Sequence, residues 1–375
     1  MDRVGVVMQH YKIHGGIESC VYSLVEGLNR RDIVPVVVGR LNDPSEEEGI
    51  HREIEERFGR SLRFDFVPLW IDRLRKTRRL DRLTQDASPY LALHLPFLRL
   101  RLVYDFLEAL PLWVPRGRYV KYWNYYLDPD PADSARRRRR TGPMFRWLQM
   151  RTFARGYPIF LNSAYTAESA AALLGRRLPV LYPPVAVRRF WSTQDRPRRG
   201  VATWGRFAPD KRQMDLLPVA RLLADEGFEE PFCLVGGTES FPAYFEAIRE
   251  KIASEGLANV SVVPNRPLSE VVEILRSTAI YVHLTVNEPF GITTAEAMAA
   301  GCIPLVHDSG GQTEIVPWPE LRWKALPELA RKIRHLAADP DVLRTWRARC
   351  QEHVLSFAEE RFQDTLLGFL DRRQS

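Results

Sequence analysis

Two glutamates, Glu288 and Glu296, lie on either side of a glycine in the segment Asn287–Gly301. Glu288 ends a loop that follows an apolar run, and Glu296 falls within the helix expected next. A carboxylate accepts hydrogen bonds from two hydroxyl groups, which suits a sugar diol. Phe290–Ile292 stands at the helix start, where N–H groups without an intrahelical partner attract phosphate. The pattern predicts a site for a phosphorylated, hydroxyl-rich ligand; the alternative is an exposed Glu288 and a surface ion pair at Glu296.

Two cations stand in an earlier loop, Gly205–Arg212, which also follows an apolar run. Arg206 can offer a diphosphate two parallel hydrogen bonds, and Lys211 a point charge. Only seven of the 54 basic residues are lysine, so the choice of Lys211 is informative. The alternative is a pair of solvated loop cations.

A glycine pair, Gly15-Gly16, follows the first apolar run of the chain. Two adjacent glycines let backbone N–H groups approach an anion closely, and a helix start adds partial positive charge. A tight turn explains the same pair equally well.

Parallel strands have to bring these loops together. Val4–Met8, Ser19–Asn29 and Val34–Val38 predict a strand, a helix and a strand, which is a βαβ unit. Val201–Trp204 restarts the pattern. The remaining elements expected in the second half are strands at 232–235, 260–263, 279–284 and 303–306, and helices at 213–226, 268–276 and 293–300. Each half therefore predicts a doubly wound α/β domain, with ligands beyond the carboxyl ends of its strands.

Length and composition fit this organisation. The chain has 375 residues, 45% hydrophobic and 27% charged, as in ordinary globular proteins. At roughly 150 residues per domain two domains are expected, with a boundary in the proline-rich and arginine-rich stretch 182–199. No apolar run reaches the length of about 18 residues that a membrane-spanning helix needs. The residues after Met1 run straight into a strand-like stretch, which does not fit a secretory signal.

The charge is unevenly distributed. The formal net charge is +7, and arginines cluster at Arg73–Arg82 and Arg136–Arg140. Interleaved leucines favour a face that docks on anionic lipid, whereas solvated basic loops are the alternative. No recognised binding module accompanies the charge, so no specific nucleic-acid partner is expected. Four widely spaced cysteines argue against disulfides and a zinc site and favour a reducing, cytoplasmic compartment.

Taken in order, several segments resemble the retaining GT-B glycosyltransferases of family 4. The stretch from Ala299 to Gly311 looks most like mannosyltransferases that extend lipid-linked oligosaccharides. The segments that carry the resemblance are Gly15–Glu18, Asn162–Thr166, Leu181–Val185, Gly205-Arg206 with Lys211-Arg212, Val235–Gly237, Glu288–Glu296 and His307–Gly311.

The resemblance implies a GT-B fold, in which two Rossmann-like domains face a central cleft. It places the acceptor-binding domain at 1–190, the nucleotide-sugar domain at 191–355, and a last helix at 356–375 that packs back on the first domain. It also implies a monomer or weak dimer, which is either cytoplasmic or peripheral on the inner face of a membrane.

The resemblance also implies residue roles. Arg206 and Lys211 would neutralise the leaving diphosphate, and Glu288 would bind hydroxyls of the transferred sugar, which makes these three the catalytic candidates. Glu296 would bind the ribose diol. The donor-binding candidates are Gly15, Gly16, Gly205, Gly237, Asn265, Arg266, Phe290, Gly291, Ile292, Thr293 and Glu296.

The donor expected from the resemblance is GDP-mannose or a UDP-sugar. The two cations take the role that a metal ion has elsewhere, so no metal and no further cofactor is expected. Asp128 and Asp130 are accordingly interpreted as a proline-punctuated acidic loop.

One feature of the family is missing. Many relatives carry a histidine after a strand of the first domain, facing the sugar, whereas the comparable stretch here, Tyr119–Asn124, has none. Lys121 or Asn124 would substitute, or another strand occupies that position. His94 is the other candidate for the acceptor side.

The function expected is transfer of a hexose, mannose or glucose, from a nucleoside-diphosphate sugar to a hydroxyl of a glycan or lipid-linked acceptor, with retention of configuration. One alternative is a nucleotide-sugar epimerase or phosphorylase on the same fold. Another is a non-catalytic GT-B-like protein that binds anionic lipid or nucleic acid.

Overall fold

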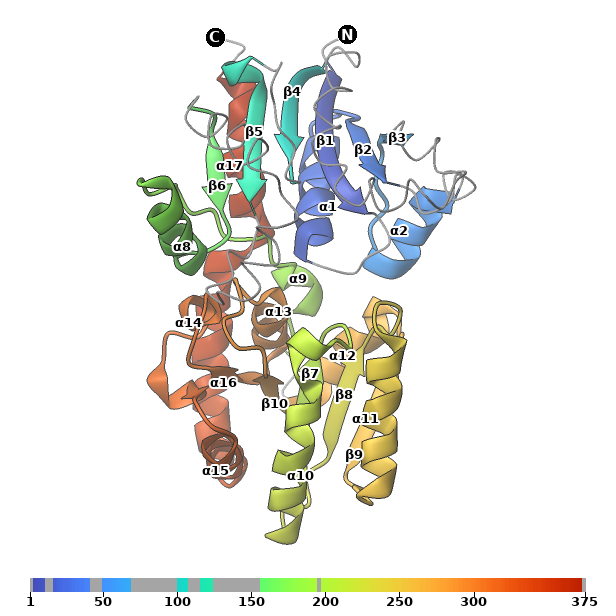
Figure 1. Cartoon of the computed structure of the whole chain (residues 1–375), viewed down its shortest axis with the longest axis vertical. Coiled ribbons are helices and arrows are strands. Elements are labelled where there is room, and N and C mark those ends of the chain that lie inside the picture. Colours follow the sequence, from blue (N-terminus) through green and yellow to red (C-terminus); the bar gives the residue numbers. More distant parts are fainter. Residues whose placement is uncertain are drawn as a thin grey trace. The chain divides into compact units, whose positions relative to one another are not determined.

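The chain folds into two compact units. The computed structural model describes residues 3–10, 16–40, 49–68, 100–106, 115–123, 156–193 and 197–372. The first unit comprises Met1–Pro184 together with Glu360–Ser375, and the second comprises Val185–Glu359. Each unit contains one parallel six-stranded sheet (Figure 1).

The sheet of the first unit has the strand order β3-β2-β1-β4-β5-β6. Its inner strands are nearly continuous apolar runs, as expected where helices cover both faces of a parallel sheet. The strands are β1 (Arg3–His10), β2 (Val36–Arg40), β3 (Asp65–Pro68), β4 (Leu100–Asp105), β5 (Tyr119–Trp123) and β6 (Ile159–Leu161).

Helices of the first unit cover both faces of this sheet. Helices α1 (Gly16–Asn29) and α17 (Glu359–Asp371) share one buried cluster with side chains of β1, β4 and β5, while α8 (Ala164–Leu174) packs on the other face. Helix α2 spans Ile50–Phe58. The Tyr104 hydroxyl donates to the Leu366 carbonyl at 2.7 Å, which ties α17 to β4. The last helix thus belongs to the core of the first unit (Figure 1).

The sheet of the second unit has the strand order β12-β11-β10-β7-β8-β9. Its strands are β7 (Arg199–Trp204), β8 (Phe232–Gly236), β9 (Val260–Pro264), β10 (Thr278–His283), β11 (Ile303–His307) and β12 (Arg322–Trp323). Its α-helices are α9 (Val187–Phe190), α10 (Leu216–Asp225), α11 (Pro242–Ser254), α12 (Leu268–Ser277), α13 (Ile292–Ala300), α14 (Gln312–Ile315), α15 (Leu326–Ala337) and α16 (Pro340–Val354).

The strand order of both sheets is that of a doubly wound domain. In the second unit the order reverses between β7 and β10, because β8 and β9 continue on one side of β7 and β10–β12 on the other. Ligands of such sheets bind at this reversal, outside the carboxyl ends of the strands. The expected fold class, two Rossmann-like α/β domains, is confirmed.

The sequence prediction differs from the structure in local detail. The helix expected at 213–226 begins with a 3₁₀ turn, Gln213–Asp215, after Arg212 in a left-handed conformation (φ 55°), and α10 follows at Leu216. Strand β12 is only two residues long, too short for a hydrophobic pattern to reveal it. No helix among the described residues combines the length and apolarity needed to cross a bilayer.

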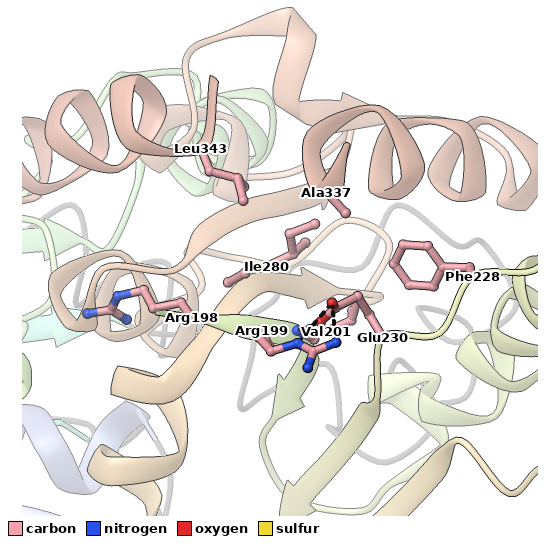
Figure 2. A pocket seen from close by; sticks show the side chains of 10 residues that line it. Arg198, Arg199, Val201, Phe228, Glu230, Ile280, Ala337 and Leu343 are labelled. Atoms are coloured by element: carbon pink, nitrogen blue, oxygen red, sulfur yellow. Dashed lines mark hydrogen bonds and ion pairs between the residues drawn. The ribbon is translucent and has the colours of Figure 1, made fainter. Parts of the chain in front are cut away.

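A small hollow lies at the amino ends of β7 and β10. Phe228, Ile280 and Leu343 line it, together with the ion pair between Arg199 Nη2 and Glu230 Oε1 at 3.0 Å (Figure 2). This is the edge of the sheet opposite to the loops that follow the strands. The hollow therefore includes none of the predicted site residues.

A buried ion pair connects β4 and β5 in the first unit. Lys121 Nζ lies 3.0 Å from Asp105 Oδ2, and the two side chains are 3% and 0% exposed. The Tyr119 hydroxyl also donates to Asp105. Burial, reinforced by the charge of Asp105, raises the pKa of Tyr119. Lys121 thus has a buried structural partner within its own sheet.

We expect Asp105→Ala to lower the free energy of unfolding by about 3–5 kcal/mol, because it leaves the Lys121 ammonium buried without its counter-ion. Urea denaturation measures this loss. The matched control is Asp65→Ala, which removes the exposed partner of Arg3 and should cost at most about 1 kcal/mol. Equal losses in the two variants would contradict the assignment.

Candidate functional site

The predicted residues of the second unit gather where its strand order reverses. The loop after β7 carries Arg206 and Lys211, and the loop after β10 carries Glu288. The hydroxyl of Tyr281 on β10 donates to the Trp204 carbonyl at the end of β7, at 3.1 Å. This bond fixes the two strand ends from which the loops leave.

The carboxylate of Glu288 contacts two nitrogen-containing side chains. Lys211 Nζ lies 2.8 Å from Glu288 Oε2, and His283 Nε2 lies 3.3 Å from the same oxygen. Asp210 Oδ2 lies 3.9 Å from both Lys211 Nζ and Arg206 Nη2. The structure thus brings Arg206, Lys211 and Glu288 into one charge cluster.

Glu288 is ionised although it is largely buried. Its side chain is 13% exposed, and this burial by itself raises the pKa of the carboxyl group. The charge of Lys211 and the hydrogen bond from His283 outweigh burial, and the pKa falls well below the usual range. At neutral pH the group is a carboxylate that accepts hydrogen bonds.

The loop after β11 holds the backbone around Glu288. The Gly311 N–H donates to the Glu288 carbonyl at 2.7 Å, and the Asn287 N–H donates to Ser309 Oγ at 2.8 Å. Gly310 has φ 71°, and a Cβ there would lie 2.5 Å from the Glu288 carbonyl oxygen. Only glycine permits this approach, which explains Gly310 in the His307–Gly311 motif.

Helix α13 begins directly after the charged loop. Gly291 caps it in a left-handed conformation (φ 105°), so the N–H groups of Ile292 and Thr293 open the helix without intrahelical acceptors. Phe290 is buried before this turn. Glu296 is 9% exposed on α13. Burial raises the pKa of the Tyr281 hydroxyl, and the negative charges of Glu288 and Glu296 raise it further.

Close backbone contacts also join the loops after β7, β8 and β9. A Cβ on Gly236 would lie 1.9 Å from the Gly205 carbonyl oxygen, and the Phe207 N–H donates to the Gly237 carbonyl at 2.8 Å. Asn265 adopts a left-handed conformation (φ 51°), and its Oδ1 accepts from the Thr238 N–H at 2.9 Å. Gly205, Gly237 and Asn265 thus form one continuous edge.

The remaining candidates lie elsewhere. Arg266 is exposed and lies 3.7 Å from Glu270 of α12, and Gly16 is the first residue of α1 in the other unit. Gly15, Asn124 and His94 lie outside the described residues, as do Asp128, Asp130 and the basic segments Arg73–Arg82 and Arg136–Arg140.

Sequence reasoning missed two members of the cluster, Tyr281 and His283. Both sit near the end of β10, in a run that reads as ordinary strand core. The usable signal was a histidine at the carboxyl end of a strand beside the reversal point, where buried polar side chains need partners. Among the described residues, no group of His, Cys, Asp and Glu side chains could hold a metal ion.

Comparison with known families and sequences gives a consistent result. Residues 191–352 match the family described as "Glycosyl transferases group 1". A relative from Xenopus tropicalis, named GDP-Man:Man(3)GlcNAc(2)-PP-Dol alpha-1,2-mannosyltransferase, is 27% identical over 229 residues, covering 56% of this chain and 47% of the relative. Its human counterpart is 25% identical over 236 residues, covering 57% and 48%. The chain spans about half the length of these curated relatives.

Solved structures resemble the whole chain in fold. Anabaena HepE, solved with UDP and glucose, has a TM-score of 0.70 at 16% identity, covering 99% of this chain and all of that chain. WaaG, a glycosyltransferase of lipopolysaccharide biosynthesis, has a TM-score of 0.69 at 15% identity, covering 97% and 100%. Residues 191–352 of this protein are therefore similar to the glycosyl transferases group 1 family, and the chain has the GT-B fold.

Proposed function

We propose that this protein is a retaining glycosyltransferase that moves mannose from GDP-mannose to a hydroxyl group of a lipid-linked or other glycan. The observation that carries the proposal is the ionised Glu288, held by Lys211 beside Arg206 and directly before the start of α13. This cluster offers cations, a carboxylate and free N–H groups at one edge of the sheet. A sugar diphosphate needs all three.

In the proposed reaction, the bond between the anomeric carbon and the diphosphate oxygen breaks, and a bond to the acceptor oxygen forms on the same face of the sugar. The acceptor proton passes to the leaving diphosphate. Arg206 and Lys211 neutralise the charge that develops on this leaving group, and the N–H groups of Ile292 and Thr293 bind phosphate oxygens. Glu288 orients the sugar through its hydroxyls, and Glu296 binds the ribose diol.

The names of the curated relatives support GDP-mannose as donor and a lipid-linked glycan as acceptor. UDP-sugars remain the second donor class in this proposal, because HepE was solved with UDP and glucose on the same fold. The basic segments Arg73–Arg82 and Arg136–Arg140 stay a prediction for contact with anionic lipid at a cytoplasmic membrane face.

Isothermal titration calorimetry with GDP-mannose, GDP-glucose, UDP-glucose and UDP-N-acetylglucosamine tests the donor. We expect GDP-mannose to bind most tightly, and product analysis with a mannosylated lipid acceptor to show a new α-linked mannose. Binding of none of the four nucleotide sugars would contradict the proposal. Conversion of the donor sugar without an acceptor would indicate an epimerase instead.

Substitution of the cations tests the mechanism. We expect Arg206→Ala and Lys211→Ala each to lower kcat by roughly 10²–10³-fold, by analogy with loss of one donor to a developing oxyanion. Glu296→Ala should chiefly raise the KM for the donor. Arg344→Ala, which removes an exposed cation from α16, is the control and should leave turnover unchanged. Full turnover in both site variants would refute the mechanism.

Glycine 310 tests whether the backbone position of Glu288 matters. Gly310→Ala places a methyl group against the Glu288 carbonyl and should weaken GDP-mannose binding about tenfold or more. Gly256→Ala is the matched control, because Gly256 also has positive φ (61°) but no atom lies within 4 Å of its added Cβ. Similar affinities in the two variants would contradict a role for the contact between Gly310 and the Glu288 backbone.

A further inference from the structure

His283 has a hydrogen-bonding partner on each side of its ring. The side chain is 7% exposed and belongs to the last residue of β10. Nε2 lies 3.3 Å from Glu288 Oε2, and Nδ1 lies 3.4 Å from the Tyr281 hydroxyl. Because the imidazole is buried between these two partners, the positions of its protons decide to which partner it donates.

The partners of Tyr281 restrict that assignment. The Tyr281 hydroxyl has two acceptors, the Trp204 carbonyl at 3.1 Å and Thr293 Oγ1 at 2.9 Å. Its single proton is donated to one or the other of them. In either case Nδ1 of His283 faces an oxygen that has already used its proton.

The Nε2 atom must carry a proton. Glu288 is a carboxylate, and a bare Nε2 lone pair at 3.3 Å would repel it. This holds for the imidazolium ion, and equally for the neutral ring with its proton on Nε2. In both forms the ring donates to Glu288 Oε2.

Lys211 and His283 both contact the same oxygen atom of Glu288, Oε2. Oε1 has no hydrogen bond to any described residue, so it remains for a hydroxyl of a ligand. Lys211 is also the group that turns toward the diphosphate in the proposed reaction. His283 is then the partner that keeps the carboxylate in place.

We propose that His283 is a positioning residue that holds Glu288 through its Nε2–H, so that Glu288 Oε1 is presented to the sugar part of the donor. The proposal rests on the proposed function above. It concerns the sugar and not the nucleotide, because Glu288 is the only member of the charge cluster assigned to sugar hydroxyls. Loss of His283 should therefore affect the nucleotide sugar but not the nucleoside diphosphate alone.

Two variants separate the two ring nitrogens. The amide nitrogen of H283Q reaches the position of Nε2, whereas that of H283N reaches only the position of Nδ1. In calorimetry we expect H283N to bind GDP-mannose about 10–100-fold more weakly than wild type, as for loss of other orienting partners. Its affinity for GDP should stay within about twofold, and H283Q should restore most of the affinity for GDP-mannose.

The same titrations in the E288A background complete a double-mutant cycle. Once the carboxylate is gone, H283N should change GDP-mannose affinity little further. Additive losses, equal losses in H283Q and H283N, or a parallel loss of GDP binding would each overturn the positioning role. If wild-type protein bound neither GDP nor GDP-mannose, the proposed function itself would fail, so the two failures are distinguishable.

Discussion

The carboxylate of Glu288 is ionised in surroundings that by themselves favour its neutral form. Burial raises its pKa, and only the Lys211 ammonium at 2.8 Å with the imidazole of His283 at 3.3 Å reverses that effect. A buried charge is tolerated only when it is paired and hydrogen-bonded. The loops after β7 and β10 therefore have to lie close together.

Backbone geometry, more than side-chain packing, keeps the loops together. Gly236 lets the strand end of β8 touch the Gly205 carbonyl, and Gly310 lets the loop after β11 lie against Glu288. Such positions cannot carry a side chain without moving a loop that bears a charged group. Gly236 and Gly310 are thus explained by the short distances between loops of the domain.

The sequence predicted the fold class because short apolar runs such as Val201–Trp204 and Ile303–Val306 alternate with segments of helical pattern. It also predicted that Lys211 and Glu288 belong to loops at the same edge, since carboxyl ends of parallel strands share that edge. It did not predict that the two side chains contact each other, because the separation of two residues along the sequence does not determine their distance in space. It missed His283, because the sequence pattern does not distinguish a functional histidine at the end of an apolar strand from an ordinary residue of the hydrophobic core.

The same limit applies to Lys121 in the first unit. Its sequence context, an aromatic strand, left open a role toward an acceptor, and the structure gives it a buried partner in Asp105 on the neighbouring strand. Only strand register pairs the two residues, and register is a tertiary property. Pairing of side chains across strands was therefore inaccessible from one sequence.

The contacts of the cluster also differ in length. Lys211 Nζ lies 2.8 Å from Glu288 Oε2, whereas Arg206 Nη2 lies 3.9 Å from Asp210 Oδ2. Because Coulomb attraction weakens with distance, Lys211 is held more firmly by Glu288 than Arg206 is by Asp210. In the proposed reaction, a Lys211 that turns toward the diphosphate leaves His283 as the remaining partner of Glu288.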